Sequence, residues 1–203
     1  MSKKSVPLVS GERYHVYNRG VDKRDIFLEK HDYLRFYQSL LFFNTIEATG
    51  SFRLAKSLSD KNITKLVQIY SYCLLPNHFH LILEQMVDGG ISEFMKRISV
   101  GYTGYFNEKY TRTGVLFQGG FKRVHIENET QFQYLVAYVN ENHTVHQINN
   151  SKEIFNTSSL HFIGVSKSKM LNEIEVNYDQ FEARKLALEI YNKRQSQKDL
   201  IDD

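Results

Sequence analysis

The sequence contains a single cysteine, only two prolines and no long hydrophobic run. Because Cys73 has no second cysteine to pair with, an intrachain disulfide and a four-cysteine zinc site are both excluded. No stretch approaches the roughly 18 apolar residues of a membrane-spanning helix, and the first residues form no apolar signal region. We therefore expect a cytoplasmic protein without a membrane partner, in which Cys73 is a small core residue.

Charge of one sign is also scarce in the chain as a whole. The formal net charge is only +3, too small to indicate a nucleic-acid binder by itself. Several basic residues nevertheless gather in clusters, and acidic residues become more frequent in the C-terminal third. This segregation allows a basic face, although charges scattered over solvated helices would give the same pattern.

The length and composition predict one domain with an appended tail. A chain of 203 residues, 41% of them hydrophobic, is long enough to bury a sizeable core. Past Asn149 the pattern of secondary structure weakens, apart from a polar stretch over residues 170–197 that favours a helix. We therefore expect a folded domain over residues 1–150 and a partly helical C-terminal extension over residues 151–203.

Strand and helix patterns interleave along the first 150 residues, which predicts an α/β or α+β fold. Pro76 and Asn77 separate two apolar strands and favour a hairpin. Asn128, followed by Gln131, resembles a capping box at the start of a helix. The predicted strands cover residues 14–18, 65–75, 78–84 and a segment ending at Ile126, and the predicted helices cover residues 31–48, 90–109 and 128–142.

The strand after Pro76 carries the motif His78-Phe79-His80. Side chains alternate across a strand, so both histidines share one face while Phe79 lies on the other. Imidazoles about 7 Å apart along a strand, twice the rise per residue, are able to bind one metal ion. Two unrelated surface histidines would give the same motif, so the pattern leaves both interpretations open.

Tyr134, Tyr138 and Asn142 follow one another at intervals of four residues in the last predicted helix. One helical face would therefore carry all three, as it would in a plain amphipathic helix with tyrosines at the edge of the core. Beside the histidines, a tyrosine could attack a phosphodiester and form a covalent phosphotyrosine. A divalent cation held by the histidines and the Asn142 amide would stabilise the charge developing on the phosphate oxygens.

Four stretches between about residues 11 and 145 resemble one protein family in their order and spacing. They are residues 14–20 (Tyr-His-Val-Tyr-Asn-Arg-Gly), residues 72–83 with the histidine motif, residues 105–119 with Tyr-Phe-Asn and Thr-Gly-Val-Leu-Phe-Gln-Gly, and residues 138–142 (Tyr-Val-Asn-Glu-Asn). They are similar to the single-tyrosine HUH transposases, named for a His-hydrophobe-His motif. Within these, the sequence resembles the REP-associated tyrosine transposases, which have an IS200-like transposase domain.

The resemblance implies an α+β fold and a reaction. The fold would be a small antiparallel-centred sheet of the ferredoxin-like HUH endonuclease type, with the histidine strand central, helices packed on it and a polar C-terminal helix. The protein would cut and rejoin single-stranded or hairpin-bearing DNA, as a monomer or a homodimer. Tyr138 would be the nucleophile, and His78, His80 and Asn142 would hold a divalent ion, with Mg²⁺ or Mn²⁺ expected and Zn²⁺ compatible with the donors.

The chain departs from the family at two positions. Relatives usually carry arginine where Gly120 stands, and they usually follow the ligating asparagine with proline, where this chain has His143. The first change removes a possible phosphate contact, partly offset by Lys122 and Arg123. The second changes how the helix ends.

Several other residues are candidates for the site. Tyr134 is the rival nucleophile, although the family spacing to Asn142 favours Tyr138. Phe117 and Phe121 are expected to pack in the core, and base stacking is the alternative. Further possible ligands are His15, His125, His143 and His146, and the candidate phosphate contacts are Arg19, Lys96, Arg97, Lys122 and Arg123.

Two other functions remain open from the sequence. A non-catalytic module that binds a DNA or RNA hairpin would use the same fold without cutting. A metal-dependent phosphoesterase that activates water would not need Tyr138. A covalent adduct between protein and DNA would separate strand transfer from both.

Overall fold

The computed structural model describes residues 7–47, 50–58, 64–145, 156–162, 164, 167–168, 170–171, 179, 182–189 and 192. Its centre is a four-stranded antiparallel sheet in the order β2-β3-β1-β4. The strands are β1 (Arg13–Arg19), β2 (Val67–Leu75), β3 (His78–Gln85) and β4 (Lys122–His125). The predicted α+β class, the hairpin and the central position of the histidine strand β3 are confirmed.

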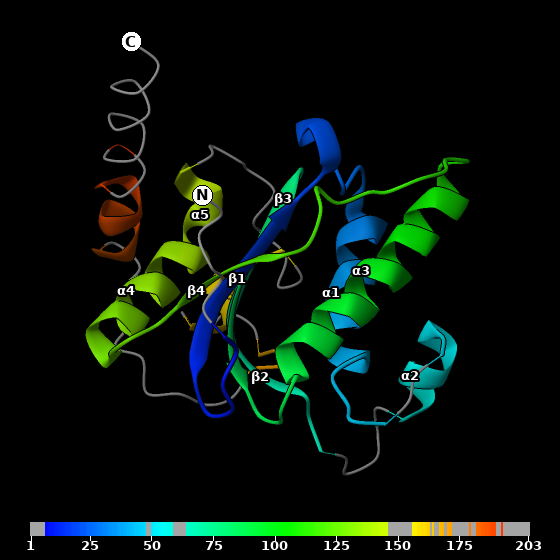
Figure 1. The fold of residues 1–203 in the computed structure, drawn as a ribbon. Coiled ribbons are helices and arrows are strands. Elements are labelled where there is room, and N and C mark those ends of the chain that lie inside the picture. The colour runs from blue at the N-terminus through cyan, green and yellow to red at the C-terminus, as the bar shows by residue number, and fades with distance from the viewer. Residues whose placement is uncertain are drawn as a thin grey trace, which may run out of the picture.

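Helices cover the two faces of this sheet (Figure 1). On one face lie α1 (Lys30–Phe42) and α3 (Gly90–Lys109), with α2 (Phe52–Leu58) packed beside α1. On the other face lie α4 (Glu129–Asn140) and α5 (Asn142–Val145). The described chain also contains the short helices η1 (Val21–Lys23) and α6 (Ser159–Phe162), and none of the described helices has both the length and the apolar character needed to cross a membrane.

The helix termini agree with the sequence prediction at the start of α4 and differ from it at the ends of α1 and α4. The Asn128 side chain caps α4 by accepting a hydrogen bond from the backbone N–H of Gln131 at 2.9 Å, as predicted. The helix predicted over residues 31–48 ends earlier, at Phe42, although Phe43 beyond it is still buried. The helix predicted to reach Asn142 ends at Asn140, because Glu141 leaves helical geometry with φ −99° and ψ 7°.

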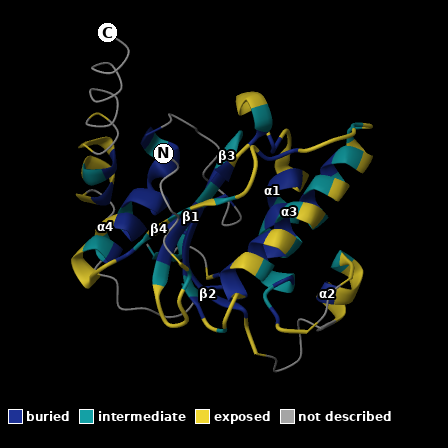
Figure 2. Cartoon of the chain, in the orientation of Figure 1, coloured by how far each residue is buried: buried dark blue, intermediate teal, exposed yellow. Residues whose placement is uncertain are grey.

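Each face of the sheet has its own apolar cluster. The strands β2 and β3 between the helix layers are accordingly coloured mostly as buried in Figure 2. Under α1 and α3 the cluster is aromatic: the Phe36 ring centroid lies 5.0 Å from those of both Phe79 and Tyr102. Under α4 and α5 it is smaller and includes Cys73, Ile82 and Val139. Cys73 is completely buried, and that burial raises the pKa of its thiol to about 12, so it is the core residue expected.

The described part of the C-terminal extension packs on β2 and α4. Ser158 donates its backbone N–H to the carbonyl of Tyr72, and Asn156 accepts from Leu74, so this segment runs along the edge of β2. Leu171 forms a parallel bridge with Ile69. The first residues of the helix predicted over 170–197 are therefore not helical. Helical geometry is described for residues 182–189 and 192, and most of the remaining predicted helix lies outside the described residues.

Candidate active site

The two histidines of β3 lie on the face covered by α4 and α5. Their ring centroids are 5.1 Å apart and the rings are nearly perpendicular. Phe79 between them is fully buried on the opposite face, against Phe36. The predicted alternation is therefore confirmed, and both imidazoles start from one side of one strand.

The neighbouring strand β1 adds two aromatic residues to this face. Tyr17 stands opposite His80 in the strand register, and the two rings are stacked with centroids 5.7 Å apart. The Nε2 atom of His15 lies 2.9 Å from Nδ1 of His80, and the His15 side chain is buried. Alternation along residues 14–17 places Tyr17 and His15 on one face, but only the pairing with β3 reveals that this face contacts the histidine motif.

Helix α4 brings Tyr138 to the same cluster. Its ring centroid lies 6.1 Å from that of His80 and 6.4 Å from that of His15, edge-on to both. Tyr138 is 5% exposed, whereas Tyr134 is 39% exposed, so the two do not share an environment. The two tyrosines are one helical turn apart on α4, as expected, and Tyr138 is the one buried against the histidines.

Asn142 opens α5 after the break at Glu141, so it does not continue the helix of Tyr138 as expected. Its side chain is completely buried. Neither its amide oxygen nor its amide nitrogen has a hydrogen-bond partner in the part of the chain that the structure describes. An unsatisfied buried amide costs about 1–3 kcal/mol. A bound ligand that pairs with the Asn142 amide would remove this cost.

Buried polar contacts hold the turn between Tyr138 and Asn142. The Asn140 amide oxygen accepts a hydrogen bond from Ser71 of β2 at 2.9 Å, and Ser158 of the extension also donates to it. Glu141 is fully buried, accepts from Ser159 at 2.9 Å and forms an ion pair with Arg184 at 3.0 Å. The C-terminal extension thereby helps to fix the backbone that carries the nucleophile and ligand candidates.

The remaining histidine candidates are engaged elsewhere. His125 contacts the Glu12 carboxylate at 2.8 Å, and Nδ1 of His143 lies 3.0 Å from the carbonyl oxygen of Asn140. Burial lowers the pKa of His143, which favours its neutral form. His146 lies outside the described residues.

The two motif histidines and the Asn142 amide are the kinds of donor that suit a divalent ion with a mixed shell. In the part of the chain that the structure describes, no three His, Cys, Asp or Glu side chains are arranged to hold a metal. Among the described residues, a third protein ligand would therefore be another kind of donor, and the buried Asn142 amide is of that kind. Two imidazoles and an amide oxygen, completed by water or phosphate oxygens, suit Mn²⁺ and allow Mg²⁺.

Two of the five basic candidates lie on the histidine face. Arg19 stands opposite His78 and donates to the side-chain oxygen of Gln118. Lys122 stands opposite Tyr17 on the edge strand β4, and its side chain is exposed. Side chains of directly paired residues lie on the same face of a sheet, so Arg19 and Lys122 flank the cluster.

The other three basic candidates are not brought to this face. Arg123 is paired with Val16, whose side chain belongs to the opposite face. On α3, Lys96 forms an ion pair with Glu93 at 3.6 Å. Arg97 donates to Glu93 and to the carbonyls of Thr45 and Glu47, and its side chain is only 12% exposed.

The two phenylalanines considered for base stacking pack in the core instead. Phe117 is 6% exposed and lies edge-on to Phe79 at 5.9 Å between ring centroids. Phe121 is partly buried against the same apolar cluster. The expectation of core packing is therefore confirmed for both.

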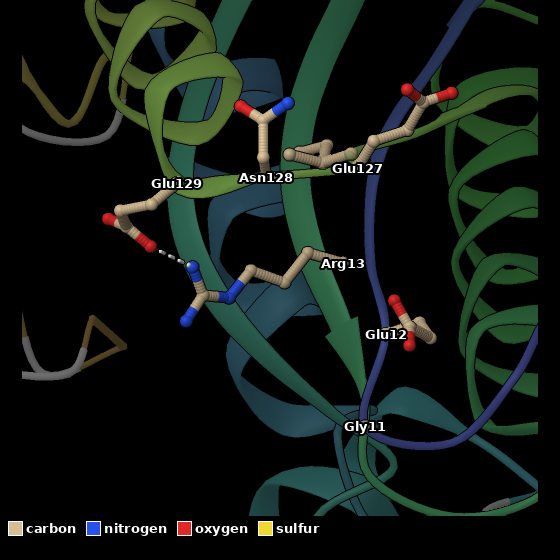
Figure 3. Close-up of a pocket in the computed structure, with 7 residues that line it drawn as sticks. Gly11, Glu12, Arg13, Glu127, Asn128 and Glu129 are labelled. Carbon is tan, nitrogen blue, oxygen red and sulfur yellow. Dashed lines mark hydrogen bonds and ion pairs between the residues drawn. The ribbon is translucent and has the colours of Figure 1, made fainter.

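A separate pocket of about 230 Å³ opens at the N-terminus of α4 (Figure 3). One arginine in it, Arg13, is paired with Glu129 at 2.9 Å. Three carboxylates line it, which would repel a phosphate, and no histidine does. The lining residues are Gly11, Glu12, Arg13, Ile126, Glu127, Asn128 and Glu129.

Comparison with known proteins relates part of this chain to a family. No curated protein sequence matches the chain. The structure of a REP-associated tyrosine transposase bound to a REP hairpin is similar in fold, with a TM-score of 0.54 and 15% sequence identity over 86% of this chain and 99% of that one. The family model of IS200-like transposases matches residues 43–142, a span that contains both motif histidines, Tyr138 and Asn142. Residues 43–142 therefore form an IS200-like transposase domain.

Proposed function

We propose that the protein is a metal-dependent endonuclease and strand transferase for single-stranded DNA, with Tyr138 as its nucleophile. The observation that carries the proposal is the position of Tyr138, whose buried ring lies against His80 and His15 of the same chain. The family supports a DNA-processing role. The similar structure has a REP hairpin bound, which favours a hairpin-bearing strand as substrate, as for REP-associated tyrosine transposases.

The chemistry begins with attack of the Tyr138 oxygen on a phosphodiester phosphorus. A bond forms between phosphorus and the tyrosine oxygen, which loses its proton. The bond between phosphorus and one sugar oxygen breaks, and that oxygen leaves as a DNA hydroxyl after taking up a proton. The product is a covalent phosphotyrosine that a second DNA hydroxyl can attack, which restores the tyrosine and joins the strands.

The residues of the cluster divide this work. His78, His80 and Asn142 would hold a divalent ion, Mg²⁺ or Mn²⁺, which neutralises charge on the phosphate oxygens when bound. Arg19 and Lys122 would contact the flanking phosphates. Helix α4 fixes the tyrosine close to the histidines, which matters because an attacking atom must lie within roughly 3–3.5 Å of its target. Tyr138 and both histidines belong to one chain, so the proposal requires no second copy.

Covalent capture tests the proposal directly. Wild-type protein, Tyr138→Phe and the matched variant Tyr134→Phe would be incubated with labelled hairpin-bearing single-stranded DNA and Mn²⁺, and then separated on a denaturing gel. We expect an adduct for wild type and Tyr134→Phe and none for Tyr138→Phe, which loses only a hydroxyl. Hairpin binding should persist in all three.

Peptide mapping of the wild-type adduct identifies the nucleophile. A DNA-linked peptide containing Tyr134 or Tyr17 would transfer the role to that residue and leave the mechanism standing. Binding of the hairpin without any cleavage would instead favour a non-catalytic binding module. Cleavage without an adduct would favour a phosphoesterase that activates water.

A further inference from the structure

Both histidines of the motif contact another side chain through the same ring atom. Nδ1 of His78 lies 2.6 Å from the amide oxygen of Asn77. Nδ1 of His80 lies 2.9 Å from Nε2 of His15. One partner is the preceding residue in sequence and the other comes from β1, yet both contacts engage Nδ1. The two imidazoles are thus held by equivalent atoms.

The contact with Asn77 determines the tautomer of His78. The Asn77 amide nitrogen donates to the carbonyl oxygen of Lys23 at 3.2 Å, which assigns the other end of the amide as the oxygen. That oxygen only accepts hydrogen bonds, so Nδ1 of His78 must carry the hydrogen. In a neutral imidazole the lone pair is then on Nε2.

The contact between His15 and His80 allows two arrangements, because one hydrogen lies between two ring nitrogens. Either His80 donates from Nδ1 and His15 accepts at Nε2, or His15 donates and Nε2 of His80 carries a hydrogen. Only the first leaves the Nε2 lone pair of His80 able to bind a metal. It also makes His80 match the tautomer of its neighbour His78.

The surroundings of His15 suit it to orient another ring. Its side chain is 3% exposed. Its ring centroid lies 5.1 Å from that of His80 in a stacked arrangement and 5.2 Å from that of Tyr17. The His15 ring lies between its own strand and the ring of Tyr138, so it has little freedom to turn away from His80.

We propose that Asn77 and His15 are positioning residues that hold His78 and His80 as Nδ1–H tautomers and so direct both Nε2 atoms at one metal ion. The inference rests on the metal site of the proposed function and adds the two residues that prepare it. Partners of this kind fix the ring orientation of a ligating histidine, and their loss typically weakens metal binding about 10–100-fold.

Nitrogen NMR of the metal-free protein tests the tautomers without reference to activity. Long-range proton–nitrogen correlations at about pH 8, where histidine is mainly neutral, distinguish the two ring nitrogens. We expect Nδ1–H signals and unprotonated Nε2 for His78 and His80 in the wild type. A hydrogen on Nε2 of His80 would overturn the role of His15, and one on Nε2 of His78 would overturn that of Asn77.

Calorimetric titration with Mn²⁺ tests the consequence for binding. Asn77→Leu and His15→Phe remove the acceptor, and we expect about 10–100-fold weaker Mn²⁺ binding from each. Asn77→Asp keeps an oxygen acceptor and His15→Gln replaces the ring nitrogen by an amide oxygen acceptor, so both should remain within about threefold of wild type or bind more tightly. Unchanged affinity in the folded Leu and Phe variants would refute the proposal. So would equally weak binding by His15→Gln and His15→Phe, which would make His15 a ligand.

These measurements separate the inference from the function on which it rests. Neither uses DNA. A wild type with the expected tautomers and Mn²⁺ affinity that forms no DNA adduct would refute strand transfer and leave the positioning role intact. Where His15→Phe fails to fold, the wild-type tautomers and the His15→Gln titration decide.

Discussion

Two buried polar side chains, one on each face of the central sheet, have opposite surroundings. On the face of α1 and α3, the fully buried Asp32 carboxylate accepts hydrogen bonds from Lys109, Tyr105 and Tyr110 and from two backbone N–H groups. On the face of α4 and α5, the buried Asn142 amide has no hydrogen-bond partner among the described residues. A satisfied network stabilises a fold, whereas an unsatisfied group costs stability, so of these two side chains Asn142 is the one suited to a ligand.

One strand serves both faces. Along β3, Phe79 and Leu81 enter the aromatic core, while His78 and His80 emerge opposite them. The rigid packing on one side therefore holds the spacing of the imidazoles on the other. If this division holds, substitutions on the two faces should separate catalysis from stability.

The largest effect is expected from the histidines themselves. His78→Ala or His80→Ala should abolish Mn²⁺-dependent adduct formation, because each removes one of the nitrogen donors. Stability should change by only about 1 kcal/mol. The gel assay and urea unfolding measure the two quantities, and His31→Ala on exposed α1 surface is the matched control. Undiminished cleavage by a folded variant would remove that histidine from the site.

The reverse outcome is expected on the opposite face. Phe36 is fully buried among Phe27, Phe79 and Tyr102, so Phe36→Ala should lower the free energy of unfolding by about 3–5 kcal/mol. At a temperature where the variant is folded, adduct formation should persist. Phe36→Leu offers a milder truncation with the same expectation. A Phe36 variant that is folded but forms no adduct would show that the two faces are coupled.

Asp32 should give a smaller and pH-dependent loss. Burial alone would raise the pKa of Asp32, but hydrogen bonds from Lys109, Tyr110 and the Leu28 N–H lower it below its usual value. A depressed pKa stabilises the fold above the unfolded-state value near 3.9 and loses that effect as pH falls through the folded-state pKa. Asp32→Asn should therefore cost about 2 kcal/mol at pH 7.

The pH series provides the control for Asp32. Urea unfolding of wild type and Asp32→Asn should show a constant difference at neutral and mildly acidic pH that shrinks below about pH 4. Asp22→Asn, at an exposed side chain, should show no such difference. A difference between wild type and Asp32→Asn that is independent of pH would mean that the carboxylate charge is not what stabilises this face.

Much of the site could be predicted from the sequence because its signals are local. Strand alternation placed His78 and His80 on one face, and the cap at Asn128 set the start of α4 correctly. The break at Glu141 was not predicted, and the contacts that this residue makes with Ser159 and Arg184 come from distant segments that no local pattern reveals. Tyr17 was missed for the same kind of reason, since only the pairing of β1 with β3 brings it to His80.

Strand register also decides between basic residues that look equivalent in sequence. Lys122 and Arg123 are adjacent, and both were predicted to contact phosphate. Their pairing with Tyr17 and Val16 places Lys122 on the histidine face and Arg123 on the other. Because a net charge of +3 gives little general attraction, binding should depend on such local charges and on hairpin shape.

We therefore expect Lys122→Gln to weaken hairpin binding about threefold to tenfold and to reduce the slope of log affinity against log salt by about one. Arg123→Gln, its matched neighbour, should change neither quantity appreciably. Titrating a hairpin oligonucleotide at several salt concentrations, beside unstructured and duplex controls, measures both. The hairpin should bind most tightly to wild type. Equal losses in the two variants would mean that DNA contacts side chains on both faces of the edge strand β4. The division between the two faces would then not extend to DNA binding.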